Sequence, residues 1–267
     1  MARKSPRKKY GIVILLDALG ASTFTESQIR QFLAARAYIN DFVKDFPGFI
    51  KRAGVKDIGT FPPPAVFTFG DTVIITVPLR TKKYIYAHIL SVALLMRRYL
   101  FHSLEEGIMF RGSFSIGYYL EDSQSNTVMG PSLIDAAAWY DQSEWMGLSS
   151  TPKTNSVLEY LAGSSEPEKS LFIYMVPYNV PLKSGETFRL YTINWPSIFL
   201  DKSLVPKAHQ KNPTKYFLDC LQNFFVPKGT EMKFENTKKY FSVMMARAAN
   251  KANSADAKKP RASHAGR

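Results

Sequence analysis

Cysteine and histidine are scarce in this chain: its 267 residues contain one cysteine, Cys220, and four histidines. A single thiol excludes an internal disulfide framework and fits a reducing compartment. His88 and His102 fall in a helical pattern without the partners that metal-ligand spacing requires, so we expect packed or solvated histidines. Cys220 has no neighbouring histidine motif and is interpreted as a small buried hydrophobic residue.

Long uncharged apolar runs are also missing. The apolar stretch that follows the basic start is short and is interrupted by Asp17, which does not fit a signal peptide. Residues 84–101 are apolar but contain His88, Arg97 and Arg98, so they make a poor membrane span. The sequence has no P-loop, dinucleotide-binding fingerprint or nucleophile elbow. We therefore predict a soluble, cytoplasmic protein without a membrane partner.

Positive charge is abundant but unevenly placed. The formal net charge is +13, and residues 1–9 carry five positive charges and no negative one. Residues 247–267 carry six positive charges and one negative charge, so the body of the chain is close to neutral. Such tails can contact nucleic acid or anionic lipid, but their composition is more typical of solvated, disordered ends. We predict disorder over 1–9 and 246–267, with nucleic-acid contact as the less favoured interpretation.

The rest of the chain has the composition of a globular protein. Hydrophobic residues make up 45% and charged residues 21%, which is enough for a sizeable core. We assign residues 10–200 to one domain and residues 201–245 to a C-terminal helical extension. No internal repeat is visible in either part.

Strand and helix patterns alternate along the domain. Residues 10–16 are typical of a buried strand, and a Thr25–Gln28 capping box then begins a helix that Pro47–Gly48 should end. A hairpin around Gly70–Asp71 follows. The further predicted elements are a helix over 81–106, a strand over 109–120, a helix from Pro131 to about 144, and strands over 170–176 and 188–194.

The order strand, helix, hairpin, helix, strand is that of a split βαβ unit. It predicts an α+β fold with a ferredoxin-like antiparallel sheet, helices on one face, and C-terminal additions. In this topology the first strand runs in the same direction as the first hairpin strand. Asp17, which follows the first strand, and Asp71, in the hairpin turn, should therefore meet at one edge of the sheet.

Two carboxylates at one sheet edge are hard oxygen ligands suited to Mg²⁺ or Mn²⁺. The small residues Gly20, Ala21 and Ser22 lie beside Asp17 before a helix, where backbone N–H groups and the helix dipole favour phosphate oxygens. Paired metal ions next to such a cradle can activate an attacking hydroxyl and neutralise a departing pyrophosphate. Each piece alone is weak evidence, because an aspartate after a strand is commonly a cap or turn residue.

Four segments between residues 11 and 145 occur in a recognisable order. They are VILLDALGAS, FTFGDTVIITV, FRGSFSIGYY and VMGPSLIDAAAWYD. Together they resemble the metal-binding and following motifs of class III nucleotidyl cyclases. The resemblance implies a homodimer with active sites between the subunits, in which Asp17 and Asp71 each ligate both of two metal ions, Mn²⁺ or Mg²⁺. It also implies a ligand from the Ala18 carbonyl, and attack of a 3′-hydroxyl on the α-phosphate to give a 3′,5′-cyclic nucleotide and pyrophosphate.

The chain departs from the purine members of that family at three positions. Where they carry a base-reading Lys or Glu, this sequence has Phe67, which cannot hydrogen-bond to a purine edge. An aromatic ring there would fill the space left by a smaller base or stack on it, although ordinary sheet core is an equally good interpretation. The helical Asn and Arg of the family fall at Ile134 and Ala138. Arg111, or a lysine from 202–215, would then have to replace the missing Arg.

In lacking the base-reading residue and the Asn and Arg pair, the chain resembles the pyrimidine cyclases of bacterial antiphage signalling (Pycsar). That resemblance implies conversion of UTP to cyclic UMP, a second messenger read by a separate effector protein. Three alternatives stay open: a cytidylate cyclase that makes cyclic CMP, a purine cyclase or related two-metal nucleotidyltransferase, and a non-catalytic nucleotide-binding module. Retention of both aspartates argues against the last, because a binding module has no need of paired metal ligands.

Overall fold

The computed structural model describes residues 7–52, 62–79, 85–122, 124–163, 171–224, 226 and 228–257. Its strands are β1 (Arg7–Ala18), β2 (Ala65–Phe69), β3 (Thr72–Pro78), β4 (Phe110–Asp122), β5 (Thr127–Met129), β6 (Gly147–Ser150), β7 (Met175–Pro181) and β8 (Thr187–Ile193). Its helices are η1 (Ala21–Thr23), α1 (Glu26–Lys44), α2 (Phe46–Arg52), α3 (Ile85–Glu105), α4 (Pro131–Trp139), α5 (Pro152–Ala162), α6 (Leu171–Tyr174), η4 (Trp195–Leu200), α7 (Pro213–Gln222) and α8 (Glu231–Ala257).

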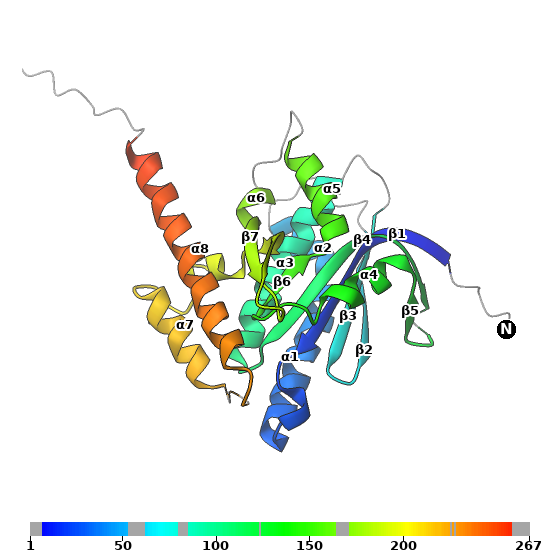
Figure 1. The fold of residues 1–267 in the computed structure, drawn as a ribbon, viewed down its shortest axis with the longest axis horizontal. Coiled ribbons are helices and arrows are strands. Elements are labelled where there is room, and N and C mark those ends of the chain that lie inside the picture. The colour runs from blue at the N-terminus through cyan, green and yellow to red at the C-terminus, as the bar shows by residue number, and fades with distance from the viewer. Residues whose placement is uncertain are drawn as a thin grey trace, which may run out of the picture.

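One sheet in the order β2-β3-β1-β4-β6-β8-β7 forms the centre of the molecule, and β5 pairs with β4 outside this path (Figure 1). β1 lies between β3 and β4 and is antiparallel to both, while β2 is antiparallel to β3. The first strand therefore runs in the same direction as the first hairpin strand. Only the β4–β6 pair, among the strand pairs described, is parallel. The predicted α+β fold with a ferredoxin-like antiparallel sheet is confirmed.

The two faces of the sheet carry different cores because successive side chains of a strand point to opposite faces. On one face Ile12, Ile14 and Leu16 belong to the main core, to which α1, α3, α7 and α8 also contribute. On the other face Val13 and Leu15 belong to a smaller cluster beneath α4. Figure 1 shows α4 and α3 on opposite sides of the sheet. The two helices of the split βαβ unit, α1 and α3, therefore share one face as predicted, and α4, which belongs to the additions, covers the other face.

Local sequence signals account for most of the element boundaries. The Thr25–Gln28 capping box forms as predicted, and the hairpin turns at Gly70, whose φ of 58° favours glycine. Pro47 does not end a helix: α1 stops at Lys44, and Pro47 lies in the first turn of α2, where its missing N–H costs little.

Two further boundaries differ from the prediction, and two elements were not predicted. α4 ends at Trp139 instead of near 144, and residues 171–174 of the expected strand form α6 before β7 begins. β6 and α5 were not predicted from the sequence, because a four-residue strand of small residues has no clear apolar period.

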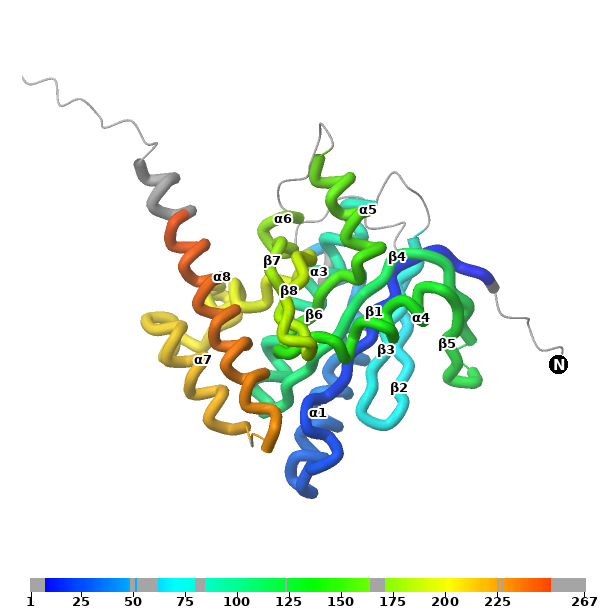
Figure 2. The backbone as a smooth tube through the Cα atoms, in the orientation of Figure 1, coloured from blue at the N-terminus to red at the C-terminus, as the bar shows by residue number. Residues whose placement is uncertain are grey.

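Both ends of the chain contribute to regular elements. β1 begins at Arg7, and α8 continues to Ala257, so part of each segment expected to be disordered is ordered. Residues 1–6 and 258–267 lie outside the described residues. Figure 2 shows α7 and α8 side by side, and the rings of Phe217 and Phe241 stack 3.9 Å apart between them. The division at residue 201 stays a prediction.

Within the parts of the chain that the structure covers, no helix is both long and apolar enough to cross a membrane.

Candidate active site

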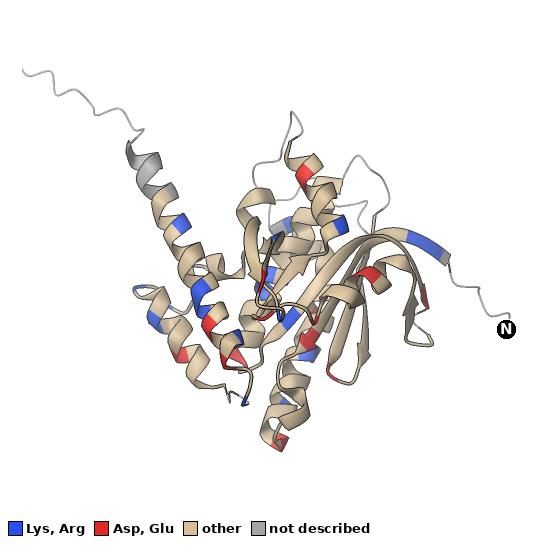
Figure 3. Ribbon diagram, in the orientation of Figure 1, with Lys and Arg blue, Asp and Glu red and all other residues tan. Residues whose placement is uncertain are grey.

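The end of β1 and the β2–β3 turn meet at one edge of the sheet. Asp17 pairs with Thr72 in the β1–β3 register, and the Ala18 N–H donates to the Asp71 carbonyl over 3.3 Å. Gly70 makes the tight turn that returns the chain to Asp71. Figure 3 shows acidic residues both at the end of β1 and at this turn. The predicted convergence of the two aspartates is therefore present in the fold.

Arg111 lies opposite Asp17 in the β1–β4 register and forms an ion pair with it. Its Nε and Nη2 atoms donate to Oδ2 of Asp17 over 3.3 and 3.2 Å, and its Nη1 donates to the Asp141 carbonyl over 3.2 Å. Only 13% of the Arg111 side chain and 16% of the Asp17 side chain are exposed. The guanidinium of Arg111 thus already contacts Asp17, the carboxylate that is the candidate metal ligand.

Burial raises the pKa of Asp17 above its ordinary value of 3.8. The positive charge of Arg111 opposes this shift, and the negative charges of Asp71 and Asp141 add to it. A carboxylate that is half desolvated and crowded by two others favours a bound cation.

Asp141 and Lys183 belong to this group, although the sequence did not point to either. Lys183, in the turn between β7 and β8, pairs with Asp141 over 3.2 Å. Burial alone would raise the pKa of Asp141, but the hydrogen bond and charge of Lys183, helped by Arg111, hold it below its usual range. Among the described residues the lysine bound at this site is Lys183, not one from 202–215. Only a tertiary contact could have identified it.

Tyr140 is a third residue that the sequence did not indicate. It caps the C-terminal end of α4, and its ring packs on the small cluster beneath that helix. Burial raises the pKa of its phenol, and the charges of Asp17 and Asp141 raise it further.

The segment after Tyr140 is held from two sides. The Glu144 N–H donates to the Pro181 carbonyl over 2.8 Å, and the Glu144 carboxylate pairs with Lys233 of α8 over 3.5 Å. Asn236 Nδ2 also donates to the Glu144 carbonyl over 2.8 Å. The C-terminal helix therefore fixes the loop that carries Asp141.

The predicted phosphate cradle follows Asp17 directly. Gly20 has a φ of 81° and begins the short helix η1, in which Ser22 is exposed and Ala21 is half-buried. The Thr23 hydroxyl donates to the Gly20 carbonyl over 2.8 Å and stabilises the turn. Backbone N–H groups in such a turn can approach an anion closely because the side chains are small.

Phe67 does not line an open wall beside the aspartates. Its side chain is only 1% exposed and lies in the cluster with Val13, Leu15 and Ile74. In this structure the sheet-core interpretation of Phe67 fits, and a stacking contact with a base would require the covering elements to move. Ile134, where the motif resemblance led us to expect an Asn, is 69% exposed on the outer side of α4.

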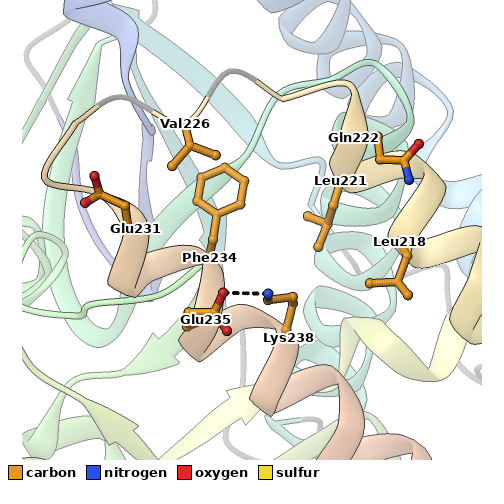
Figure 4. Close-up of a pocket in the computed structure, with 8 residues that line it drawn as sticks. All are labelled: Leu218, Leu221, Gln222, Val226, Glu231, Phe234, Glu235 and Lys238. Carbon is orange, nitrogen blue, oxygen red and sulfur yellow. Dashed lines mark ion pairs between the residues drawn. The ribbon is translucent and has the colours of Figure 1, made fainter.

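His88, His102 and Cys220 lie in α3 and α7, away from this group. His88 is buried in α3, and His102 stacks on Tyr38 with ring centroids 3.4 Å apart. Cys220 is buried as predicted, and burial raises the pKa of its thiol to about 12. A groove between α7 and α8 is also separate, because no aspartate of the site lines it (Figure 4).

The donor set suits hard divalent cations. Asp17 and Asp71 provide carboxylate oxygens; burial raises the pKa of Asp17, and the charges of Asp71 and Asp141 raise it further, so a bound cation would favour its ionised form. In the described part of the chain no group of three or more His, Cys, Asp or Glu side chains is arranged to hold a metal ion. Two carboxylates with the remaining ligands drawn from substrate phosphates and water is the pattern that Mg²⁺ prefers.

No protein-family model matches this chain, and no curated protein matches its sequence. The backbone of the chain is similar in its path to several solved structures. These include the adenylyl cyclase CyaB from P. aeruginosa (12% identity, 71% of this chain and 96% of that chain, TM-score 0.41). A bacterial light-regulated adenylyl cyclase is similar at 15% identity over 79% of this chain and 100% of that chain, with a TM-score of 0.37. The catalytic core of a rhodopsin-guanylyl cyclase with converted specificity, in complex with ATPalphaS, is similar at 11% identity over 71% and 98%, with a TM-score of 0.39.

Proposed function

We propose that this protein is a nucleotidyl cyclase that converts UTP into 3′,5′-cyclic UMP and pyrophosphate. The supporting observation is the meeting of Asp17 and Asp71 at one sheet edge, with Arg111 bound to Asp17 and the small residues of the η1 turn beside them. The order of the four cyclase-like motifs supports the same reaction. Asp71 lies in the hairpin turn between β2 and β3, where packing does not require a carboxylate.

Asp17 and Asp71 would hold two divalent cations, Mn²⁺ or Mg²⁺, with the Ala18 carbonyl as a further ligand. Bound there, the cations would lower the pKa of the 3′-hydroxyl and neutralise charge on the departing pyrophosphate. The chain itself would orient the triphosphate through the N–H groups of the turn at Gly20–Ser22. Bond formation between the 3′-oxygen and the α-phosphorus would release pyrophosphate, and the hydroxyl proton would pass to solvent.

Arg111 and Lys183 would replace the missing helical Arg. Arg111 presents two N–H donors to one carboxylate oxygen, and the same fork can bind two oxygens of a phosphate. Lys183 is paired with Asp141, and its side chain is 40% exposed and so accessible to a substrate. When the nucleotide binds, the side chains of Arg111 and Lys183 would each exchange a carboxylate partner for a phosphate partner.

The proposed preference for a pyrimidine rests on Phe67, because this residue provides no hydrogen bond to a purine. A phenyl side chain offers no hydrogen bond to a purine edge, and its buried position fills the sheet face with apolar atoms. A site that pairs with a base edge rejects the wrong base strongly, since mispairing leaves buried polar groups unsatisfied. Other polar groups must therefore read the pyrimidine, and we expect UTP first, CTP second, and ATP and GTP to be poor substrates.

The proposed enzyme is a cytoplasmic homodimer with its active sites between the subunits. The outer side of α4 supports this assignment, because Ile134 and Ala138 leave an apolar surface exposed next to the site. The product would act as a second messenger for a separate effector protein in antiphage defence.

One competition assay tests the reaction and the base together. Purified protein is incubated with equimolar UTP, CTP, ATP and GTP and with Mn²⁺, and the products are identified by mass spectrometry. We expect cyclic UMP to dominate. Dominant cyclic CMP, cyclic AMP or cyclic GMP would refute the uridylate assignment and retain the cyclase. Absence of every cyclic product would refute the cyclase and favour a nucleotide-binding module.

A further inference from the structure

Tyr140 is the one aromatic side chain among the described residues that joins the apolar cluster beneath α4 to the charged group at the sheet edge. Its N–H donates to the Ala136 carbonyl over 3.0 Å, which makes it the C-terminal cap of α4. Its ring packs against the cluster that contains Val13 and Leu15. Asp17 follows those two residues on the same face of β1, so the ring lies next to the part of that face where Asp17 lies.

The Tyr140 hydroxyl lies at the charged end of this arrangement. It is within electrostatic reach of Asp17, Asp141, Asp71 and Arg111. It forms no hydrogen bond with any residue that the structure describes, although a phenol can donate one and accept one. The position of the residue is nevertheless fixed, because the carbonyl of the next residue accepts from Arg111 Nη1.

The ribose of a nucleotide bound at this edge needs both an apolar contact and a hydrogen-bonding contact. The phosphates of the nucleotide would lie at the two aspartates, and its base would point away from them along the surface, because the apolar cluster beneath α4 is covered. The ribose, with an apolar ring face and two hydroxyls, would then lie between them. A tyrosine offers the matching surface, since its ring is apolar and its far end forms hydrogen bonds.

We propose that Tyr140 positions the ribose and that its hydroxyl hydrogen-bonds the 2′-hydroxyl, so that the site selects ribonucleotides over 2′-deoxyribonucleotides. This inference rests on the proposed nucleotide site and adds to it the recognition of the sugar. Tyr140 is a substrate-positioning residue in this scheme, and the 3′-hydroxyl remains the group that reacts.

The test compares UTP with 2′-deoxy-UTP, which keeps the reacting 3′-hydroxyl. The wild type and Tyr140→Phe are assayed with each nucleotide, and the ratio of the two kcat/KM values is measured. Loss of one neutral hydrogen bond should lower this ratio about two- to tenfold in the variant. Tyr160→Phe, on the exposed side of α5, is the matched control and should leave the ratio unchanged. Because Tyr140→Phe keeps the ring, a purely structural role would change both nucleotides equally, and an unchanged ratio would overturn the inference.

A second readout separates this inference from the cyclase itself. If no nucleotide is cyclised by the wild type, the proposed function fails, but calorimetric binding of UTP and 2′-deoxy-UTP with Mn²⁺ still tests Tyr140. We expect the wild type to bind UTP more tightly than the deoxy form and Tyr140→Phe to lose most of that difference. Equal binding of the two nucleotides by the wild type would overturn the inference on its own.

Discussion

Replacing Asp71 by asparagine should separate catalysis from folding. The residue lies in a hairpin turn, and the hydrogen bond that its backbone makes to Ala18 does not involve the side chain. An asparagine side chain has nearly the same shape as an aspartate, so we expect the free energy of unfolding to change by no more than about 0.5 kcal/mol. The lost negative charge is one that raises the pKa of Asp17, so its removal slightly favours the ionised form of that carboxyl.

Turnover should respond very differently to the same change. A metal-held carboxylate contributes several kcal/mol of transition-state stabilisation, and a loss of about 3 kcal/mol slows the reaction more than about 100-fold. The assay measures cyclic nucleotide by mass spectrometry with Mn²⁺, next to thermal unfolding of the same preparation. Asp41→Asn, at an exposed position of α1, is the matched control. A folded Asp71→Asn protein that turns over at the wild-type rate would refute the two-metal assignment.

Three further predictions follow from burial, pKa and exposure. Phe67→Ala should lower the free energy of unfolding by about 3–5 kcal/mol in denaturant titration, because the ring is fully buried; a loss as small as that of Phe69→Ala, at an exposed position of the same strand, would contradict this. Burial raises the pKa of Asp17, so the stability that this group contributes is present below pH 3.8 and is lost as the pH rises through the folded pKa. The stability of Asp17→Asn relative to the wild type should therefore increase from about pH 4 to pH 7, and a pH-independent difference would argue against the raised pKa. Ile134→Glu should shift the chain toward monomer in light scattering and reduce turnover, whereas Tyr160→Glu should do neither; a fully active monomer would rule out shared sites.

The chemistry of the turns made the arrangement of the two aspartates predictable. A buried strand that ends at Asp17 and a Gly-Asp turn between two β-rich runs are local signals, since each depends on residues within a few positions. Element order then restricts the sheet to few topologies, and the split βαβ order places both carboxylates at one edge. The Thr25–Gln28 capping box formed for the same reason.

Contacts between distant residues could not be predicted in this way. Lys183 reaches Asp141 across 42 positions, and nothing in either segment alone indicates the pair. α8 runs on through residues whose composition suggested a disordered tail, because Tyr240 and Phe241 bury against the main core and stabilise the helix from outside its own sequence.

For this protein the sequence by itself determined the α+β class, the ferredoxin-like strand order and the convergence of Asp17 with Asp71, because periodicity and turn residues act locally. Only the tertiary structure decided that α4 covers the second face of the sheet, that Phe67 is enclosed in the cluster beneath it, and that Tyr140, Asp141 and Lys183 join the site. Those outcomes depend on the packing of segments far apart in the chain, where burial and charge are set by neighbours that no local pattern specifies.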